Sequence, residues 1–227
     1  MRIFAIGDLH LSTKTPKTMD IFGENWHNHW EKIQESWLKN VTEEDVVLIP
    51  GDISWAMSLE DAVFDLDEIS KMPGKKIIMK GNHDYWWQSL NKINCVVGDD
   101  IKLLQNNCYD VGDYYICGTR GWNVPGSKDF SEQDRKIYER EVQRLALSIK
   151  ACKEDKPKIV MMHYPPYNDR CEFNEFIDVF MEYDIKRVIF GHIHGAGLWN
   201  LKEGNIFGIN FECVSCDYLN FKVKPLV

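Results

Sequence analysis

The stretch "KKIIMKGNHDYWWQS", residues 75–89, decides how the rest of the chain is interpreted. Residues 77–79 are a short apolar run, which is typical of a buried strand. A glycine and three polar residues, Asn82, His83 and Asp84, follow almost at once. Polar groups are costly to bury unless they are paired. A buried strand that ends in three of them therefore predicts that these side chains have partners at the strand end.

The composition is that of a globular protein from a reducing compartment. The chain has 227 residues, 44% hydrophobic and 27% charged, enough for one domain with a substantial core. Its net charge of −8 disfavours a general affinity for nucleic acid or for anionic membranes. No segment is apolar enough for a signal peptide or a membrane span. Seven cysteines without framework spacing indicate reduced thiols and a cytoplasmic location.

Five short apolar runs are near-continuous rather than alternating, which is typical of parallel strands covered on both faces. The runs are "RIFAIG", "DVVLIPG", "KKIIMKG", "KIVMMH" and "RVIFGH". Helical patterns lie between them, at about residues 26–40, 58–71, 131–152 and 174–183. Ser58 and Ser131 are expected helix caps, because each has an aspartate three residues on. Antiparallel hairpins are expected at residues 101–122, turning at 111–113, and at 198–224, turning at 203–205.

Each of these runs ends in residues that can bind a metal ion. The candidate ligands are Asp8, His10, Asp52, Asn82, His163, His192 and His194. Ligands bind at the carboxyl ends of strands in open α/β sheets, so these side chains converge if the five runs share one parallel sheet. Oxygen and imidazole donors that converge without cysteine predict a metal site, and their number exceeds what one ion needs.

The donors fit two divalent ions. One ion could take Asp8, His10, Asp52 and His194, and the other could take Asp52, Asn82, His163 and His192. Asp52 would bridge, since a carboxylate can serve two cations about 3.5–4 Å apart. The metals would lower the pKa of a bridging water from ~15.7 towards ~7, and the residual positive charge favours an anionic substrate. Phosphoryl transfer needs chiefly positioning and charge neutralisation, so the set predicts hydrolysis of a phosphate ester. Mixed imidazole and carboxylate ligands favour Mn, Fe or Zn over Ca.

The five blocks resemble, in chain order, the signature blocks of the calcineurin-like metallophosphoesterases. The matching residues are Asp8-Leu-His10, Gly51-Asp52, Gly81-Asn82-His83-Asp84, His163 and Gly191-His192-Ile-His194. The resemblance implies a single domain over residues 1–227. It also implies an α/β fold, a four-layer αββα sandwich of two mixed sheets with helices on the outer faces. In the family, the counterpart of His83 contacts the phosphate and assists the leaving group, and the following acid, here Asp84, orients it.

Departures from known subfamilies narrow the substrate class. Purple acid phosphatases place a tyrosine ligand three residues after the bridging aspartate, where this chain has Trp55. Serine/threonine protein phosphatases carry an Asp-Arg pair shortly after that aspartate, and "GDISWAMSLE" lacks it. Repair nucleases share the blocks but usually bring extra domains and basic surfaces. The expected substrate is a small phosphorylated molecule, with monoesterase and phosphodiesterase or nuclease activity both open.

Substrate contacts are less constrained by the pattern. Arg120 is a candidate second phosphate contact, and Trp55 is a candidate aromatic wall beside the ligands. His27 and His29 could line the pocket entrance, although the face of a helix is their ordinary place. No pattern indicates an oligomeric state.

Two functions from other classes remain as alternatives. A non-catalytic scaffold of the same fold tends to lose ligands or the counterpart of His83, and this chain has them all. A redox protein could use Cys213 and Cys216, but a lone CxxC without a second pair favours two ordinary cysteines.

Overall fold

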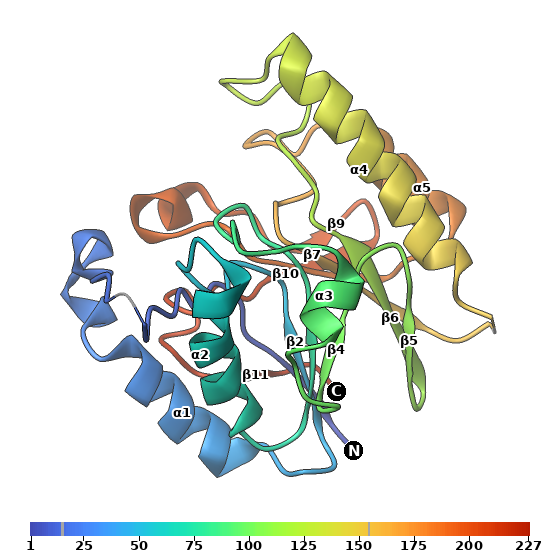
Figure 1. Cartoon of the computed structure of the whole chain (residues 1–227). Coiled ribbons are helices and arrows are strands. Elements are labelled where there is room, and N and C mark those ends of the chain that lie inside the picture. The colour runs from blue at the N-terminus through green and yellow to red at the C-terminus, as the bar shows by residue number, and fades with distance from the viewer. Residues whose placement is uncertain (15, 154) are drawn as a thin grey trace. The chain divides into compact units, whose positions relative to one another are not determined.

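A computed structural model describes residues 1–14, 16–153 and 155–227 of the chain (Figure 1). These residues form two compact units. The first comprises Met1–Leu103 together with Val214–Val227, and the second comprises Leu104–Cys213. Each unit is built on one mixed β-sheet with its own helices.

The sheet of the first unit has five strands in the order β11-β1-β2-β3-β4. The strands are β1 Ile3–Ala5, β2 Val46–Ile49, β3 Lys75–Ile78, β4 Ile101–Leu103 and β11 Lys224–Pro225. β1 to β4 run parallel to one another, and β11 pairs with β1 in the antiparallel direction. The two ends of the chain therefore meet beside β1 (Figure 1), where the N–H of Ile3 donates to the carbonyl of Val227.

Helices cover the first sheet with apolar side chains. They are α1 His29–Asn40, α2 Leu59–Ser70 and α3 Leu90–Asn94, preceded by 3-10 turns at Asp20–Phe22 and Glu24–Trp26. Trp37 of α1 and Leu66 of α2 lie in one core with Val47 of β2, and burial of such side chains is the main driving force for docking a helix on a sheet. The predicted cap of α2 is confirmed, because Ser58 Oγ accepts the N–H of Asp61.

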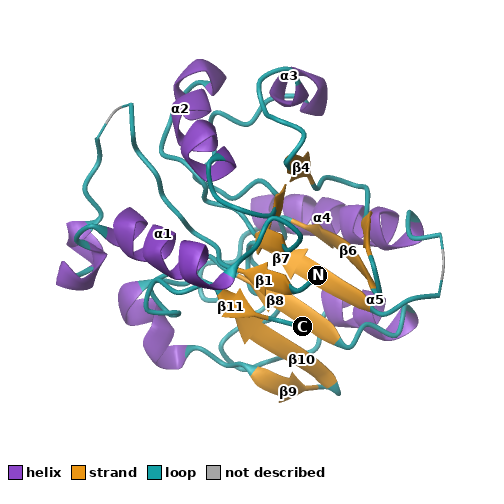
Figure 2. Ribbon diagram, turned by 90° about the horizontal axis from the view of Figure 1, so that it is seen from below, coloured by secondary structure: helices purple, strands orange, loops and turns teal. Residues whose placement is uncertain are grey.

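The sheet of the second unit has six strands in the order β5-β6-β7-β8-β10-β9. The strands are β5 Tyr109–Val111, β6 Tyr114–Thr119, β7 Lys158–Met162, β8 Arg187–Phe190, β9 Gly204–Ile206 and β10 Ile209–Cys213. The four central strands are parallel, and β5 and β9 are antiparallel edges. Figure 2 shows β8, β10 and β9 next to one another.

Two helices of the second unit, α4 Glu132–Lys150 and α5 Glu175–Glu182, lie side by side (Figure 1), and a 3-10 helix spans Gly195–Asn200. α4 starts at the predicted Ser131, whose Oγ accepts the N–H of Asp134, while Asp134 accepts the N–H of Ser131. This reciprocal arrangement is a capping box, and it satisfies two backbone donors that the first turn of a helix leaves unpaired.

The predicted α/β class with two mixed sheets and helices is confirmed. All five apolar runs are strands, but they do not share one sheet. The first three lie in the first sheet as β1, β2 and β3, and the other two lie in the second sheet as β7 and β8. Convergence of the ligands in a single parallel sheet was conditional on all five runs sharing that sheet, and this condition is not met. Apolar runs show that a strand is buried on both faces without showing which strand is its neighbour.

Two further expectations need correction. The stretch expected as one hairpin at 101–122 is divided, because β4 pairs in parallel with β3, and only β5 and β6 form the hairpin. The last hairpin turns at Phe207-Gly208 rather than at 203–205. Both turn residues have positive φ, 56° and 79°, as the tight turns favoured in hairpins require.

Helix α3 was not predicted. None of the helices in the described part of the chain is long and apolar enough to cross a membrane.

Candidate active site

Three parallel strands of the first unit end in candidate ligands at the same edge of the sheet. Asp8 and His10 follow β1, Asp52 follows β2, and Asn82 follows β3. Backbone hydrogen bonds join the first two loops: the N–H of Asp8 donates to the carbonyl of Gly51 at 3.0 Å, and the N–H of His10 donates to the carbonyl of Asp52 at 2.9 Å. Asp8, His10 and Asp52 are buried. The first unit therefore brings its own share of the predicted ligands together.

Four candidate ligands have a left-handed backbone. The φ angles are 59° for Asp8, 46° for His10, 51° for Asp52 and 73° for His192. Residues other than glycine rarely adopt this conformation, although aspartate, asparagine and histidine tolerate it best. Strained backbone of this kind costs about 1–3 kcal/mol per residue and gathers at functional sites. The backbone at these strand ends is thus shaped for the placement of side chains at some expense of stability.

The carboxylate of Asp52 contacts other residues of the ligand loops in the first unit. Its Oδ1 accepts the N–H of His83 at 2.8 Å, and its Oδ2 lies 3.7 Å from Nε2 of His10. Gly81 passes so close that a Cβ there would lie 2.1 Å from Asp52 Oδ1 and 2.2 Å from the Asp52 nitrogen. Only glycine fits at this position. The glycine after β3 is what allows residues 82 and 83 to approach the carboxylate.

The carboxylate of Asp84 is fully buried and binds the backbone of both neighbouring loops. It accepts the N–H groups of Asp52, Ile53, Ser54 and Gly81 and the indole N–H of Trp86, at 2.7–3.2 Å. Burial, and secondly the charge of Asp52, raise the pKa of Asp84 to about 6. Within the described residues, its hydrogen-bond partners do not include the imidazole of His83, which Asp84 was expected to orient.

The imidazole of His83 is half-buried and lies among aromatic rings. Its centroid is 4.5 Å from the ring of Trp55 and 5.8 Å from that of His10. Trp55 itself stacks on His10, at 4.8 Å and 22° between the planes. The arrangement places the half-buried His83 beside the ligand loops and next to Trp55.

The second unit presents its candidate ligands at the carboxyl ends of β7 and β8. His163 follows β7, and His192 and His194 follow β8. The N–H of Gly191 donates to the carbonyl of His163 at 3.1 Å. The rings of His163 and His192 have centroids 5.0 Å apart, and Tyr164 packs on His192 at 4.1 Å. The second unit therefore brings two of its three predicted ligands into ring contact.

Arg120 follows β6, next to His163. Its carbonyl accepts the N–H of His163 at 3.1 Å. Its guanidinium lies 4.7 Å over the ring of Trp122 and 3.8 Å from Glu141, and burial lowers the pKa of Arg120. The buried Nε has no hydrogen-bond partner among the described residues. Beside it, Trp122, Tyr164 and His192 line a cavity of about 170 Å³.

The remaining candidates have other surroundings. His29 donates through Nε2 to the carbonyl of Leu9 at 2.9 Å, and burial lowers its pKa, so this neutral imidazole supports the loop that carries Asp8 and His10. His27 is exposed. Cys213 and Cys216 are buried, and the thiol of Cys216 donates to the carbonyl of Asp8 at 3.1 Å. This environment fits a structural thiol better than a redox pair.

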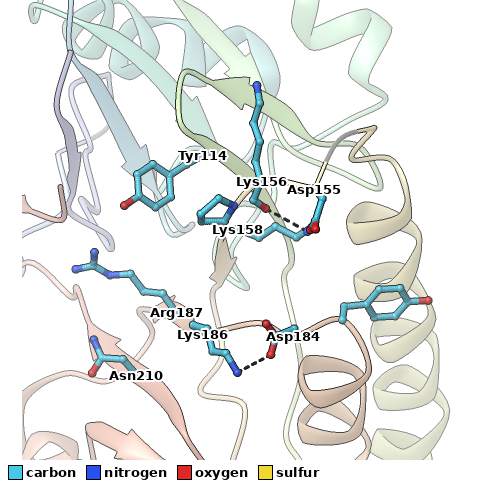
Figure 3. A pocket seen from close by; sticks show the side chains of 10 residues that line it. Tyr114, Asp155, Lys156, Lys158, Asp184, Lys186, Arg187 and Asn210 are labelled. Carbon is cyan, nitrogen blue, oxygen red and sulfur yellow. Dashed lines mark hydrogen bonds and ion pairs between the residues drawn. The ribbon is translucent and has the colours of Figure 1, made fainter.

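A larger cavity, of about 660 Å³, lies at the other edge of the second sheet (Figure 3). Its walls include Tyr114, Lys158 and Arg187, at the amino-terminal ends of β6, β7 and β8. Several of its cations have acidic partners: Lys156 pairs with Asp110, Lys186 with Asp184 and Arg187 with Glu212. The candidate ligands follow the opposite, carboxyl ends of these strands, so this cavity is not part of the candidate site.

Residues 1–196 match the family of calcineurin-like phosphoesterases. The chain belongs to this family. The match covers every candidate ligand in both units, and it makes the protein a phosphoesterase. The sequence resemblance is thereby confirmed.

Relatives of this phosphoesterase are distant. A probable cyclic nucleotide phosphodiesterase of Coxiella burnetii is 22% identical over 207 residues, which cover 86% of this chain and 76% of the relative. A phosphopantetheinyl hydrolase of Mycobacterium tuberculosis is 14% identical with a TM-score of 0.59, covering 100% of this chain and 95% of that one. A protein of unknown function from Aquifex aeolicus has a TM-score of 0.51 at 14% identity, covering 99% and 95%. At such identities the two solved structures show the fold.

The side chains at the strand ends fit a metal ion. Six of them offer ligand atoms suited to one: Asp8, His10 and Asp52 in the first unit, and His163, His192 and His194 in the second. Carboxylate oxygen and imidazole nitrogen together suit divalent transition metals. The donors of this phosphoesterase therefore agree with the metal dependence of its family.

Proposed function

We propose that this phosphoesterase hydrolyses a phosphate ester of a small molecule with the help of two divalent transition-metal ions, Mn, Fe or Zn. The first unit would supply Asp8, His10, Asp52 and Asn82, and the second would supply His163, His192 and His194. Asp52 would serve both ions. The observation that carries the proposal is the left-handed backbone of four of these residues, each in the loop that follows a parallel strand.

We also propose that residues 1–227 act as one domain in a cytoplasmic protein. The family match runs from residue 1 to residue 196 and so includes parts of both units. All seven cysteines, each of them in the described residues, are free thiols, which supports a reducing compartment.

When bound, the two ions neutralise the charge of the phosphate and activate the attacking water. The side chains of the protein then have the tasks of binding, orientation and proton transfer. The half-buried imidazole of His83 would donate a proton to the departing oxygen. Arg120, whose guanidinium extends from the end of β6 next to His163, would bind phosphate oxygens. Trp55 would form an aromatic wall beside His83.

The relatives support a small phosphorylated substrate. One is a probable cyclic nucleotide phosphodiesterase, and another is a phosphopantetheinyl hydrolase. We therefore keep hydrolysis of a monoester and hydrolysis of a diester as candidate reactions. Polymeric nucleic acid is a less favoured substrate, because the chain carries a net charge of −8.

The first experiment measures metal content and substrate range together. Elemental analysis of protein purified from metal-replete medium should find two transition-metal ions per chain, and added Mn²⁺ should activate best. A panel of nucleotides, cyclic nucleotides, dinucleotides, sugar phosphates and phosphopeptides should then separate monoesterase from diesterase activity. Full activity with a metal content near zero would contradict the proposal.

Asp52→Asn should weaken the binding of both ions, whereas Asp8→Asn should weaken chiefly the binding of one.

A second experiment isolates the role of His83. A general acid contributes about 10²–10⁴-fold where the leaving group needs a proton. His83→Asn should therefore keep both metals, lose little rate on a nitrophenyl ester and lose far more on an alkyl ester. Equal losses on the two esters would show that His83 binds the phosphate instead, and loss of metal would show that it is a ligand.

A further inference from the structure

The ammonium group of Lys17 lies over the indole ring of Trp55, within the first unit. Its Nζ is 3.2 Å from the ring centroid, well inside the ~6 Å over which a cation and an aromatic face attract each other. Within residues 1–14, 16–153 and 155–227, this Nζ makes neither an ion pair nor a hydrogen bond. Lys17 is exposed. The cation is thus held in place by an aromatic face and remains accessible to a negatively charged ligand.

Backbone contacts hold both members of the pair. The N–H of Lys17 donates to Oγ of Ser12 at 3.1 Å, and Ser12 Oγ donates to the carbonyl of Lys17 at 3.2 Å. The N–H of Trp55 donates to the carbonyl of Leu11 at 2.9 Å, and its indole N–H contacts the sulfur of Met19 at 3.1 Å. Two separate loops are therefore shaped so that the lysine meets this tryptophan.

The same indole ring contacts the candidate site. It lies 4.5 Å from the ring of His83 and stacks on that of His10. The indole ring of Trp55 thus contacts both the Lys17 ammonium and the imidazole that would protonate the leaving group.

We propose that Lys17 binds a negative charge carried by the leaving group of the substrate. The inference rests on the proposed function, because a leaving group protonated by His83 departs beside Trp55. A leaving group that bears a phosphate or a carboxylate can lie against the indole and reach the ammonium, whereas a neutral one gains no such contact. The substrate class is then a phosphate ester or anhydride whose departing part has an anionic group of its own.

The test uses two esters that differ in one charge. 4-Carboxyphenyl phosphate and 4-carbamoylphenyl phosphate are nearly isosteric, and both would be prepared as monoesters and as methyl diesters. In Lys17→Met, which keeps the length of the side chain and removes the charge, the ratio of kcat/KM for the carboxyl ester to that for the carbamoyl ester should fall about three- to fivefold. This is the upper range for one exposed ion pair. The fall should diminish at high salt.

A readout independent of turnover accompanies the kinetics. Calorimetric titration with 4-carboxybenzyl- and 4-carbamoylbenzylphosphonate, which are not hydrolysed, should show the same change in the ratio of the dissociation constants.

The matched control is Lys14→Met. Lys14 belongs to the same loop, and its Nζ lies 4.8 Å over Phe64, so its loss changes the net charge equally without touching Trp55. The ratio should stay at the wild-type value in this variant. An unchanged ratio in Lys17→Met, or an equal fall in Lys14→Met, would overturn the proposal and leave the cation–aromatic pair a structural contact. Absence of turnover of all four esters by metal-loaded wild-type protein would instead contradict the proposed function, while the phosphonate titrations would still decide the role of Lys17.

Discussion

At the scale of single residues, the site depends on a carboxylate that faces the backbone. Asp84 accepts hydrogen bonds from the loop after β2 and from the loop after β3, so it joins the segments that carry Asp52 and Asn82. A buried carboxylate with several N–H donors is a rigid connection, because each donor would otherwise be unsatisfied. We infer that it positions the proposed ligands themselves.

Replacing Asp84 by Asn should therefore loosen the metals. The amide offers one acceptor oxygen, and its NH₂ group would face backbone N–H donors on one side. Loss of such a partner behind metal ligands typically costs about 10–100-fold in metal affinity. Titration of metal-free Asp84→Asn with Mn²⁺, followed by electron paramagnetic resonance, should show weaker binding, whereas His83→Asn should bind as the wild type does. Tight metal binding by Asp84→Asn combined with a leaving-group-dependent loss of rate would restore the expected link to His83.

The backbone contacts of Asp84 could not be predicted from the sequence. The family resemblance implied that Asp84, which follows His83 in the chain, orients its imidazole. The structure places its carboxylate instead under residues 52–54, about thirty positions earlier in the chain. Which backbone groups a side chain reaches depends on how two loops approach each other, and Gly81 permits that approach by lacking a Cβ. A pattern of residue types does not show how closely two loops approach each other.

At the scale of elements, the ends of β1, β2, β3, β7 and β8 were predictable because each of these strands is a short apolar run soon followed by polar residues. Helix starts were predictable for a similar reason, since Ser58 and Ser131 each have an aspartate at the position that closes the first turn. The turn between β9 and β10 was misplaced, because Phe207 looks like a strand residue and only its positive φ shows that it belongs to the turn. The sequence thus predicted helix and strand boundaries that depend on a side chain, and it missed a turn that depends on the backbone conformation.

The capping box of α4 offers a test at this scale. Ser131→Ala removes the acceptor of the Asp134 N–H and should lower the free energy of unfolding by about 1 kcal/mol. Asp134 also accepts the indole N–H of Trp122 at 2.6 Å, so the start of the helix is tied to the loop that follows Arg120. Urea unfolding followed by tryptophan fluorescence would measure the change, and Ser131→Thr, which keeps a hydroxyl, should restore most of it. Equal losses in both variants would show that the hydroxyl bond is not what matters.

At the scale of the whole molecule, the proposed ligands are divided between two units, four in the first and three in the second. The sequence showed seven donors after five strands. Apolar periodicity alone could not show which strands share a sheet, because apolar runs buried on both faces look alike in either sheet. The resemblance of the five blocks to the calcineurin-like metallophosphoesterases implied two sheets, and the strand order confirms them. The stability of the first unit in turn depends on how its separate segments are joined near the start of β1.

Asp45 makes such a connection. Its buried carboxylate accepts the backbone N–H of Arg2 at 2.7 Å and the Arg2 guanidinium at 2.8 Å. It also accepts the N–H of Thr42 at 2.9 Å and its hydroxyl at 3.0 Å. Burial by itself would raise the pKa of Asp45, but the hydrogen bonds from Arg2 and Thr42 outweigh it and hold the pKa well below its ordinary value. The residue before β1 is thereby tied to the residue before β2.

Because the pKa of Asp45 is lowered in the folded protein, its contribution to the free energy of unfolding decreases as the pH falls. In the unfolded chain an aspartate titrates near ~3.9, so the stabilisation is complete above that pH and is lost as the pH falls towards the lower pKa of the folded protein. Asp45→Asn should lower the free energy of unfolding by about 2 kcal/mol at pH 7, as the loss of hydrogen bonds to a charged group does. The difference in this free energy between the variant and the wild type should narrow below about pH 4. Urea unfolding at pH 7, 5, 4 and 3 would measure it. Glu44→Gln, an exposed neighbour with the same change in charge, should show no gap at any pH. A gap for Asp45→Asn that stayed constant down to pH 3 would mean that packing, and not the ionised carboxylate, links the two strands.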